Sequence, residues 1–156
     1  MLLKNVVKKN ITVHKDFPKK GILFQDIFSL TKNPELMTSI TKSIVSYIKQ
    51  NKITKVVGID SRGFIFGSCA ALRAKIPFVP ARKAGKLPGK VYKQKYKLEY
   101  GYDQIEMQSQ SITKNDRVLI VDDLVATGGT ALATINLLKK TNKKKIYCYF
   151  IVGLKC

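Results

Sequence analysis

The stretch from Val118 to Ile135 constrains the fold of this chain more than any other segment. It reads VLIVDDLVATGGTALATI, so an apolar run leads into two adjacent carboxylates, a short loop of Thr and Gly, and then a helical pattern. A short apolar run followed by a loop and a helix is typical of a strand in a parallel sheet whose two faces are covered.

The loop in this stretch has the chemistry of a binding site for a phosphorylated sugar. Its glycines let the backbone approach an anion, and the amides at the start of a helix point toward one. Thr127 and Thr130 can add hydroxyl donors, whereas ionised Asp122 and Asp123 only accept and therefore suit ribose hydroxyls. The string matches neither the nucleoside-triphosphate P-loop nor the dinucleotide fingerprint. An ordinary strand-to-helix turn is the less favoured alternative.

Short apolar runs that alternate with helical patterns predict the α/β class. A helix is expected to begin at Pro34, because Asn33 suits an N-cap and Glu35 suits the first turn. We expect helices at 34–50, 64–74 and 129–140, and strands at 55–59, 78–81, 118–121 and 146–152. This order predicts a single domain, residues 1–156, in which helices flank a twisted, mostly parallel sheet.

Residues 82–104 interrupt this alternation. Their first part, Arg82 to Lys90, is polar and rich in Gly, and Tyr92 to Tyr100 alternates aromatic residues with Lys. A long irregular insertion in a compact domain is often a functional lid, and we expect one here. A solvated hairpin is the alternative.

Polar residues follow three of the predicted strands. Ligands of parallel sheets bind at the carboxyl ends of the strands. The segment after Ile59 reads Asp-Ser-Arg-Gly, and the segment after Val79 reads Pro-Ala-Arg-Lys. Because Arg binds phosphate groups bidentately, both segments suit a second anion such as pyrophosphate, close to the sugar-phosphate site that follows Val121.

Five motifs, in order, resemble the type I phosphoribosyltransferase family, most closely its adenine-specific branch. They occupy residues 17–27, 57–67, 79–89, 96–101 and 118–130. The resemblance implies the family fold, with an N-terminal hood at about 10–30, a flexible catalytic loop at about 82–104 and the phosphoribosyl pyrophosphate motif at 118–130. It also implies a reaction of purine salvage, in which the 5-phosphoribosyl group of phosphoribosyl pyrophosphate is transferred to adenine, giving AMP and pyrophosphate.

The resemblance assigns roles to individual residues. The ribose hydroxyls would be held by Asp122 and Asp123, and the 5′-phosphate by the loop of Ala126, Thr127, Gly128, Gly129 and Thr130. Pyrophosphate would be bound by two segments, which supply Asp60, Ser61, Arg62, Arg82, Lys83 and Lys86, and the Asp60–Ser61 peptide is where the family often has a cis bond.

The remaining roles concern binding of the adenine base and transfer of a proton of the purine. Leu23, Phe24 and Gln25 would line the adenine pocket, and Glu99 matches the family's acid/base residue. Mg²⁺ would be the cofactor, held mainly by oxygens of the substrate and water, so no metal site made by protein side chains is expected. A homodimer is implied as well.

Three positions bear on the base. Relatives that act on oxopurines typically have Asp where this chain has Ala126, which favours adenine. Gln25 stands where the family usually has Arg, and the chain ends at Cys156, where members usually continue. We therefore expect weaker closure of the base pocket than in a typical member.

The net charge of +19 suggests a different class of function. Such a charge suits a polyanionic partner, so a regulator on this fold that senses phosphoribosyl pyrophosphate and binds nucleic acid is one alternative hypothesis. A transferase for another base is a second. The lysines are scattered along the chain, however, and nucleic acid is not the favoured partner.

Cysteine usage and hydropathy predict a cytoplasmic protein. The three cysteines are irregularly spaced, which suits a reducing compartment. No secretory signal is visible, and the longest apolar stretch, Ile146 to Leu154, is shorter than the ~20 residues needed to cross a bilayer. No association with a membrane is expected.

Overall fold

The computed structural model divides the chain into two units, Met1–Ser43 and Ile44–Cys156, which are considered separately below. The structure describes residues 3–97, 101–125, 128–141 and 145–153. Within these ranges, no helix is both long enough and apolar enough to cross a membrane.

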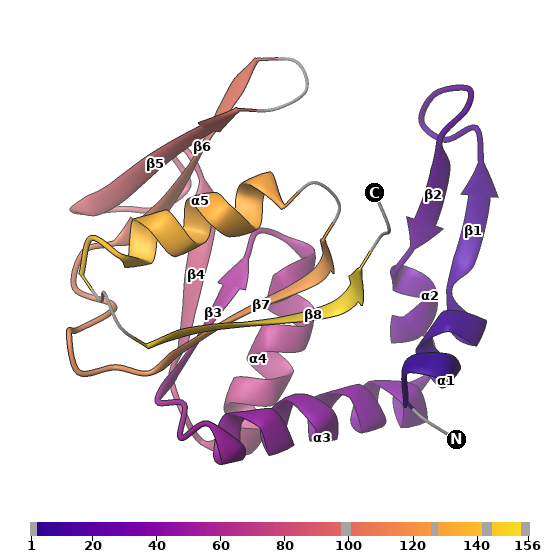
Figure 1. Cartoon of the computed structure of the whole chain (residues 1–156), viewed down its shortest axis with the longest axis horizontal. Coiled ribbons are helices and arrows are strands. Elements are labelled where there is room, and N and C mark those ends of the chain that lie inside the picture. The colour runs from indigo at the N-terminus through magenta and orange to yellow at the C-terminus, as the bar shows by residue number, and fades with distance from the viewer. Residues whose placement is uncertain (1–2, 98–100, 126–127, 142–144, 154–156) are drawn as a thin grey trace. The chain divides into compact units, whose positions relative to one another are not determined.

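The first unit consists of short elements in the region predicted as the hood. Its elements are α1 (Leu3–Asn10), β1 (Thr12–Lys15), β2 (Leu23–Asp26), α2 (Phe28–Thr31) and the first part of α3 (Pro34–Gln50). Strands β1 and β2 form an antiparallel hairpin, shown in indigo and violet in Figure 1. The rings of Phe17 and Phe24 pack edge to face, with centroids 5.0 Å apart.

The second unit is built on a six-stranded sheet. Its strands are β3 (Lys55–Ile59), β4 (Phe78–Lys83), β5 (Val91–Lys97), β6 (Tyr102–Gln108), β7 (Val118–Val125) and β8 (Ile146–Gly153). Their order in the sheet is β5-β6-β4-β3-β7-β8. Strands β4, β3, β7 and β8 are parallel to one another, and β5 and β6 join them as an antiparallel hairpin (Figure 1). The predicted α/β class with a mostly parallel sheet is confirmed.

Helices cover both faces of this sheet, because successive residues of its central strands are apolar and buried. Helix α5 (Gly129–Leu138) packs against one face, where Leu137 shares a buried core with Val57 and Ile120. Helix α4 (Arg62–Ala74) packs against the other face, and a Cβ on its Gly67 would lie 3.0 Å from the Phe78 ring. Burial on both faces explains why β3 reads as an apolar run without polar alternation.

The predicted elements are found with bounds within two residues of those expected, apart from two larger corrections. Strand β7 continues to Val125, past the predicted end at residue 121. Asp122 therefore lies inside the strand, opposite Phe150, and pairing with β8 continues to Val125 and Gly153. Backbone pairing with a neighbouring strand here prevails over the low strand propensity of Asp.

The second correction concerns residues 82–104, where the expected long irregular insertion is wrong. Strands β5 and β6 pair along their whole length, from Val91 and Gln108 to Lys97 and Tyr102. The alternation of aromatic residues with Lys is the two-residue period of a half-buried strand, because Tyr92 packs against the core. Residues 91–97 and 102–104 thus belong to a hairpin that packs partly on the core, and the role of this segment as a lid stays a prediction.

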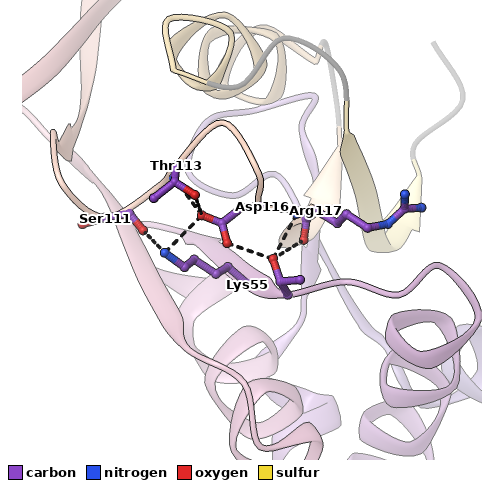
Figure 2. Close-up of polar contacts among 6 residues, drawn as sticks. Lys55, Ser111, Thr113, Asp116 and Arg117 are labelled. Atoms are coloured by element: carbon purple, nitrogen blue, oxygen red, sulfur yellow. Dashed lines mark hydrogen bonds and ion pairs between the residues drawn. The ribbon is translucent and has the colours of Figure 1, made fainter.

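A polar network ties the amino-terminal ends of β3 and β7 together (Figure 2). Asp116 lies at its centre, and its Oδ2 accepts hydrogen bonds from the Thr113 amide at 2.7 Å and hydroxyl at 2.8 Å. Its Oδ1 accepts one from the Thr54 hydroxyl at 2.9 Å, and Lys55 Nζ lies 3.2 Å from Oδ2. Burial alone would raise the pKa of Asp116, but these donors outweigh it and lower the pKa below its ordinary value of 3.8.

Replacing Asp116 by Asn is expected to lower the free energy of unfolding by about 1–3 kcal/mol at neutral pH, since an amide group would face two donors. Because the folded-state pKa of Asp116 is depressed, its contribution is present above the unfolded value of 3.8 and is lost as the pH falls through the folded value. Urea unfolding across this range measures the effect. A difference between the two proteins that stays constant as the pH falls would contradict the assignment.

Candidate functional site

A pocket lies at the carboxyl ends of β3 and β7, opposite the edge that holds Asp116. The segment 60–62, the acidic pair at 122–123 and the start of α5 all contribute to it. Its lining residues are Ile59, Asp60, Ser61, Arg62, Asp122, Asp123, Leu124, Val125, Gly128, Gly129, Thr130 and Ala131. The structure thus brings together two segments, 60 residues apart, that the sequence predicts to bind pyrophosphate and a ribose phosphate.

Gly63 sets how closely the segment after β3 approaches β7. A Cβ at this position would lie 2.6 Å from the carbonyl oxygen of Val121 and 3.0 Å from Oδ1 of Asp122. These atoms cannot move away easily, because Val121 and Asp122 both belong to the central strand β7. Sequence reasoning gave Gly63 no role of its own, although an Asp-Ser-Arg-Gly turn before a helix contains the signal.

We expect Gly63→Ala to destabilise the protein by about 1–3 kcal/mol and to distort the pocket, as overpacking does in tight cores. Gly21→Ala provides a comparison, because a Cβ there meets no atom within 4 Å and only the positive φ of +87° opposes it. Thermal unfolding measures stability, and pyrophosphate binding by calorimetry measures the pocket. Unchanged pyrophosphate binding in Gly63→Ala would contradict the expectation.

The segment after β3 is linked to the end of β4. The Asp60–Ser61 peptide is cis, as the family resemblance implied. Arg82 Nε donates to Oδ2 of Asp60 at 3.0 Å, and the Arg82 guanidinium lies 5.9 Å from the centroid of the Phe64 ring. The end of β4 therefore lies at the same edge of the sheet as the ends of β3 and β7, as the sequence predicts.

The two acids of β7 lie in different electrostatic surroundings. Asp123 is buried and forms an ion pair with Arg62, with Nε 2.7 Å from Oδ2. Among the described residues, this buried oxygen has no hydrogen-bond partner besides that ion pair. Burial, followed by the nearby Asp123 carboxylate, raises the pKa of Asp122 to about 8, against the opposing charge of Arg62.

The start of α5 is shaped to face an anion. Gly128 is its N-cap and has a left-handed backbone with φ of 78°, which glycine adopts without strain. The next residues, Gly129 and Thr130, form the first turn, where amides and the helix dipole favour negative charge. Ala126 and Thr127, predicted to complete this loop, lie outside the described residues.

Among the described residues, Arg82, Lys83 and Lys86 are not part of the pocket lining. Lys83 is mostly exposed, and its Nζ lies 3.6 Å from Oδ2 of Asp103. The carbonyl oxygen of Lys86 accepts a hydrogen bond from Arg82 Nη1 at 3.2 Å. Glu99 lies outside the part of the chain that the structure describes.

The residues predicted to contact the base belong to the first unit. Leu23, Phe24 and Gln25 lie on β2, opposite Lys15, His14 and Val13 respectively, and the side chain of Leu23 is mostly exposed. Their role in binding a base stays a prediction.

The donor groups of the pocket fit a metal ion that is held mainly through the substrate. Among the described residues, no three His, Cys, Asp or Glu side chains gather closely enough to ligate a metal. The pocket offers three carboxylates, of which Asp60 is paired with Arg82 and Asp123 with Arg62. Hard cations such as Mg²⁺ are commonly bound through one or two carboxylates together with substrate phosphates and water.

Fold and site together define an α/β protein with two segments predicted to bind anions and an acidic pair at the carboxyl edge of a parallel sheet. The family model described as "Phosphoribosyl transferase domain" matches residues 27–155. The chain therefore belongs to the phosphoribosyl transferase family.

Relatives within this family share much of the sequence. The chain is 43% identical over 150 residues to a protein from Blochmanniella floridana named adenine phosphoribosyltransferase, covering 96% of this chain and 82% of that one. It is 44% identical to a protein of the same name from Campylobacter hominis, covering 97% and 85%. The crystal structure of APRTase from Giardia lamblia complexed with 9-deazaadenine superposes with a TM-score of 0.91 at 38% identity, covering 99% and 87%.

Proposed function

We propose that this protein transfers the 5-phosphoribosyl group of phosphoribosyl pyrophosphate to adenine, giving AMP and pyrophosphate in purine salvage. The observation that carries the proposal is that the acidic pair Asp122–Asp123 and the segment Asp60–Arg62 line the same pocket. The acidic pair suits the ribose of phosphoribosyl pyrophosphate, and the segment Asp60–Arg62 suits its pyrophosphate. The names of the relatives, and the adenine analogue in the Giardia complex, support adenine as the acceptor.

The ribose and its 5′-phosphate bind along β7 and the start of α5. The carboxylates of Asp122 and Asp123 accept hydrogen bonds from the two ribose hydroxyls, which fixes the sugar. The loop that ends in Gly128, Gly129 and Thr130 surrounds the 5′-phosphate, and Ala126 and Thr127 complete it. Holding both ends of the sugar orients its anomeric carbon for attack by the base.

The leaving pyrophosphate binds at the ends of β3 and β4. Amides of the Asp60–Arg62 segment and the cations of Arg82, Lys83 and Lys86 stabilise the negative charge that develops as the bond to the anomeric carbon breaks. Mg²⁺ supplies further neutralisation of this charge when it is bound to the pyrophosphate oxygens. Arg62 is placed to exchange its partner, from Asp123 to pyrophosphate.

Adenine binds beside Leu23, Phe24 and Gln25, and Glu99 handles the proton of the purine. Backbone carbonyls in such a pocket accept from the exocyclic amine of adenine, whereas an oxopurine would leave them unpaired. Ala126 removes the Asp that oxopurine enzymes place against the base. A homodimeric, cytoplasmic enzyme is part of the same proposal.

A radiometric assay of AMP formation from adenine and phosphoribosyl pyrophosphate, with and without Mg²⁺, tests the proposal on the chain ending at Cys156. We expect turnover with adenine, dependence on Mg²⁺, and little product from hypoxanthine or guanine. Turnover with another base alone would redirect the proposal to that base. Absence of turnover with every base, together with salt-sensitive binding of nucleic acid, would favour the regulator hypothesis instead.

A further inference from the structure

The end of β4 and the turn that follows it carry three of the cations proposed to bind pyrophosphate. Arg82 and Lys83 are the last residues of β4, and the turn runs from Lys83 through Gly85, whose φ is +73°, to Lys86. The Lys86 amide donates to the Lys83 carbonyl at 3.3 Å, and the Ala84 amide donates to Gln104 on β6 at 3.2 Å. The position of the cations therefore depends on what holds this turn.

One side of the turn is held by a buried carboxylate, that of Glu106 on β6. Glu106 is 2% exposed, and its Oε2 accepts a hydrogen bond from the Gly85 amide at 3.1 Å. Its Oε1 accepts another from Gln104 Nε2 at 2.7 Å and lies 3.6 Å from Lys93 Nζ. Both oxygens are thus engaged, one of them by the backbone of the turn.

The other side of the turn is held by Arg82 itself. Arg82 stands directly opposite Glu106 in the pairing of β4 with β6, and its Nη1 donates to the Lys86 carbonyl at 3.2 Å. Its Nε is occupied by Asp60 at 3.0 Å. The turn is therefore fixed between a carboxylate at Gly85 and a guanidinium at Lys86.

Packing alone does not account for a carboxylate at position 106. Its neighbours along the strand, Ile105 and Met107, are fully buried apolar residues, and a buried ionised group carries a desolvation penalty of several kcal/mol. An apolar residue at this position would avoid that penalty, but it would leave the Gly85 amide without its acceptor.

We infer that Glu106 is a positioning residue for the reaction, which fixes the turn 83–86 so that Lys83 and Lys86 meet the leaving pyrophosphate. The inference rests on the proposed function. Glu106 acts through the Gly85 amide and does not touch the substrate. Its loss should therefore weaken interactions with pyrophosphate and leave those with adenine intact.

Calorimetric binding of inorganic pyrophosphate to the full chain, with Mg²⁺ present, tests this inference in Glu106→Ala and Glu106→Gln. We expect Ala to weaken pyrophosphate binding roughly 10- to 100-fold, as small misplacements of binding groups do. Gln keeps a carbonyl that can accept from the Gly85 amide, so it should restore most of the affinity. In the AMP-forming assay, KM for phosphoribosyl pyrophosphate should rise in parallel, while KM for adenine changes less than about 2-fold.

Asp116→Asn is the control for a general loss of stability, because Asp116 lies at the opposite edge of the sheet. It should lower stability and leave pyrophosphate affinity unchanged. Wild-type affinity in Glu106→Ala, or equal weakening of pyrophosphate and adenine, would overturn the inference. Failure of the proposed function is a separate result, because it appears as absent turnover in the wild-type chain, whereas pyrophosphate binding is measured without turnover.

Discussion

Replacing Glu99 by Gln is expected to lower kcat for AMP formation by about 10²–10⁴, the usual contribution of a general acid or base. Gln keeps the size of the side chain and can still form hydrogen bonds, but it cannot take or give a proton. The KM values for adenine and phosphoribosyl pyrophosphate should change little, because Glu99 is proposed to act in the transition state. Initial rates at saturating concentrations of both substrates measure the effect.

Glu35→Gln is the matched control, since Glu35 is an exposed acid in the first turn of α3. It makes the same chemical change in the same chain and should leave kcat at the wild-type value. If Glu99→Gln turns over at the rate of this control, the proton is handled by another group and the assignment of Glu99 is wrong.

Replacing Asp122 by Asn is expected to make the protein more stable and a poorer enzyme. Burial and the nearby Asp123 raise the pKa of Asp122 to about 8, so the folded state keeps a proton that the unfolded state releases above 3.8. Stability of the wild type therefore falls as the pH rises from about 3.8 to about 8. Asn carries no such proton, and the gain in stability should be on the order of 0.5–2 kcal/mol at pH 8 and vanish in acid.

Above about pH 8, where the carboxylate of Asp122 is ionised, the same change should weaken binding of phosphoribosyl pyrophosphate roughly 10- to 150-fold, because a hydrogen bond to a charged acceptor contributes about 1.5–3 kcal/mol. Calorimetry and urea unfolding measure the two effects on one preparation. Asp116→Asn should show the opposite pattern, with lower stability and unchanged affinity. A loss of stability at neutral pH in Asp122→Asn would show that the ionised carboxylate is favoured in the folded protein.

The architecture follows from local patterns in the sequence. Helix α3 and strand β3 begin and end where capping and apolar runs predict, because Asn33 Oδ1 accepts from the Leu36 amide at 3.0 Å and β3 is buried on both faces. Convergence of the segments after Ile59 and along β7 follows from the general placement of ligands at the carboxyl ends of parallel strands.

What local patterns missed depends on contacts between distant segments. The pairing of β5 with β6 is one example, because the sequence alone shows only lysines alternating with aromatic residues, of which Tyr92 and Tyr96 pack against the core. Glu106 has no motif around it, and its importance appears only when the Gly85 amide, 21 positions earlier, is seen to lie 3.1 Å from its carboxylate. Gly63 likewise becomes critical only when the carbonyl of Val121 is placed 2.6 Å from a hypothetical Cβ.

The network around Asp116 also has a consequence for synthesis of the chain on the ribosome. It joins Thr54 to Arg117, which are 63 positions apart, at the start of the pairing between β3 and β7. After the apolar strand β3 begins to be synthesised, more than sixty further residues must follow before β7 is available to pair with it. Such non-local pairing forms slowly and leaves hydrophobic surface exposed in the meantime. The nascent chain up to β6 should accordingly be the stage at which chaperones bind this protein.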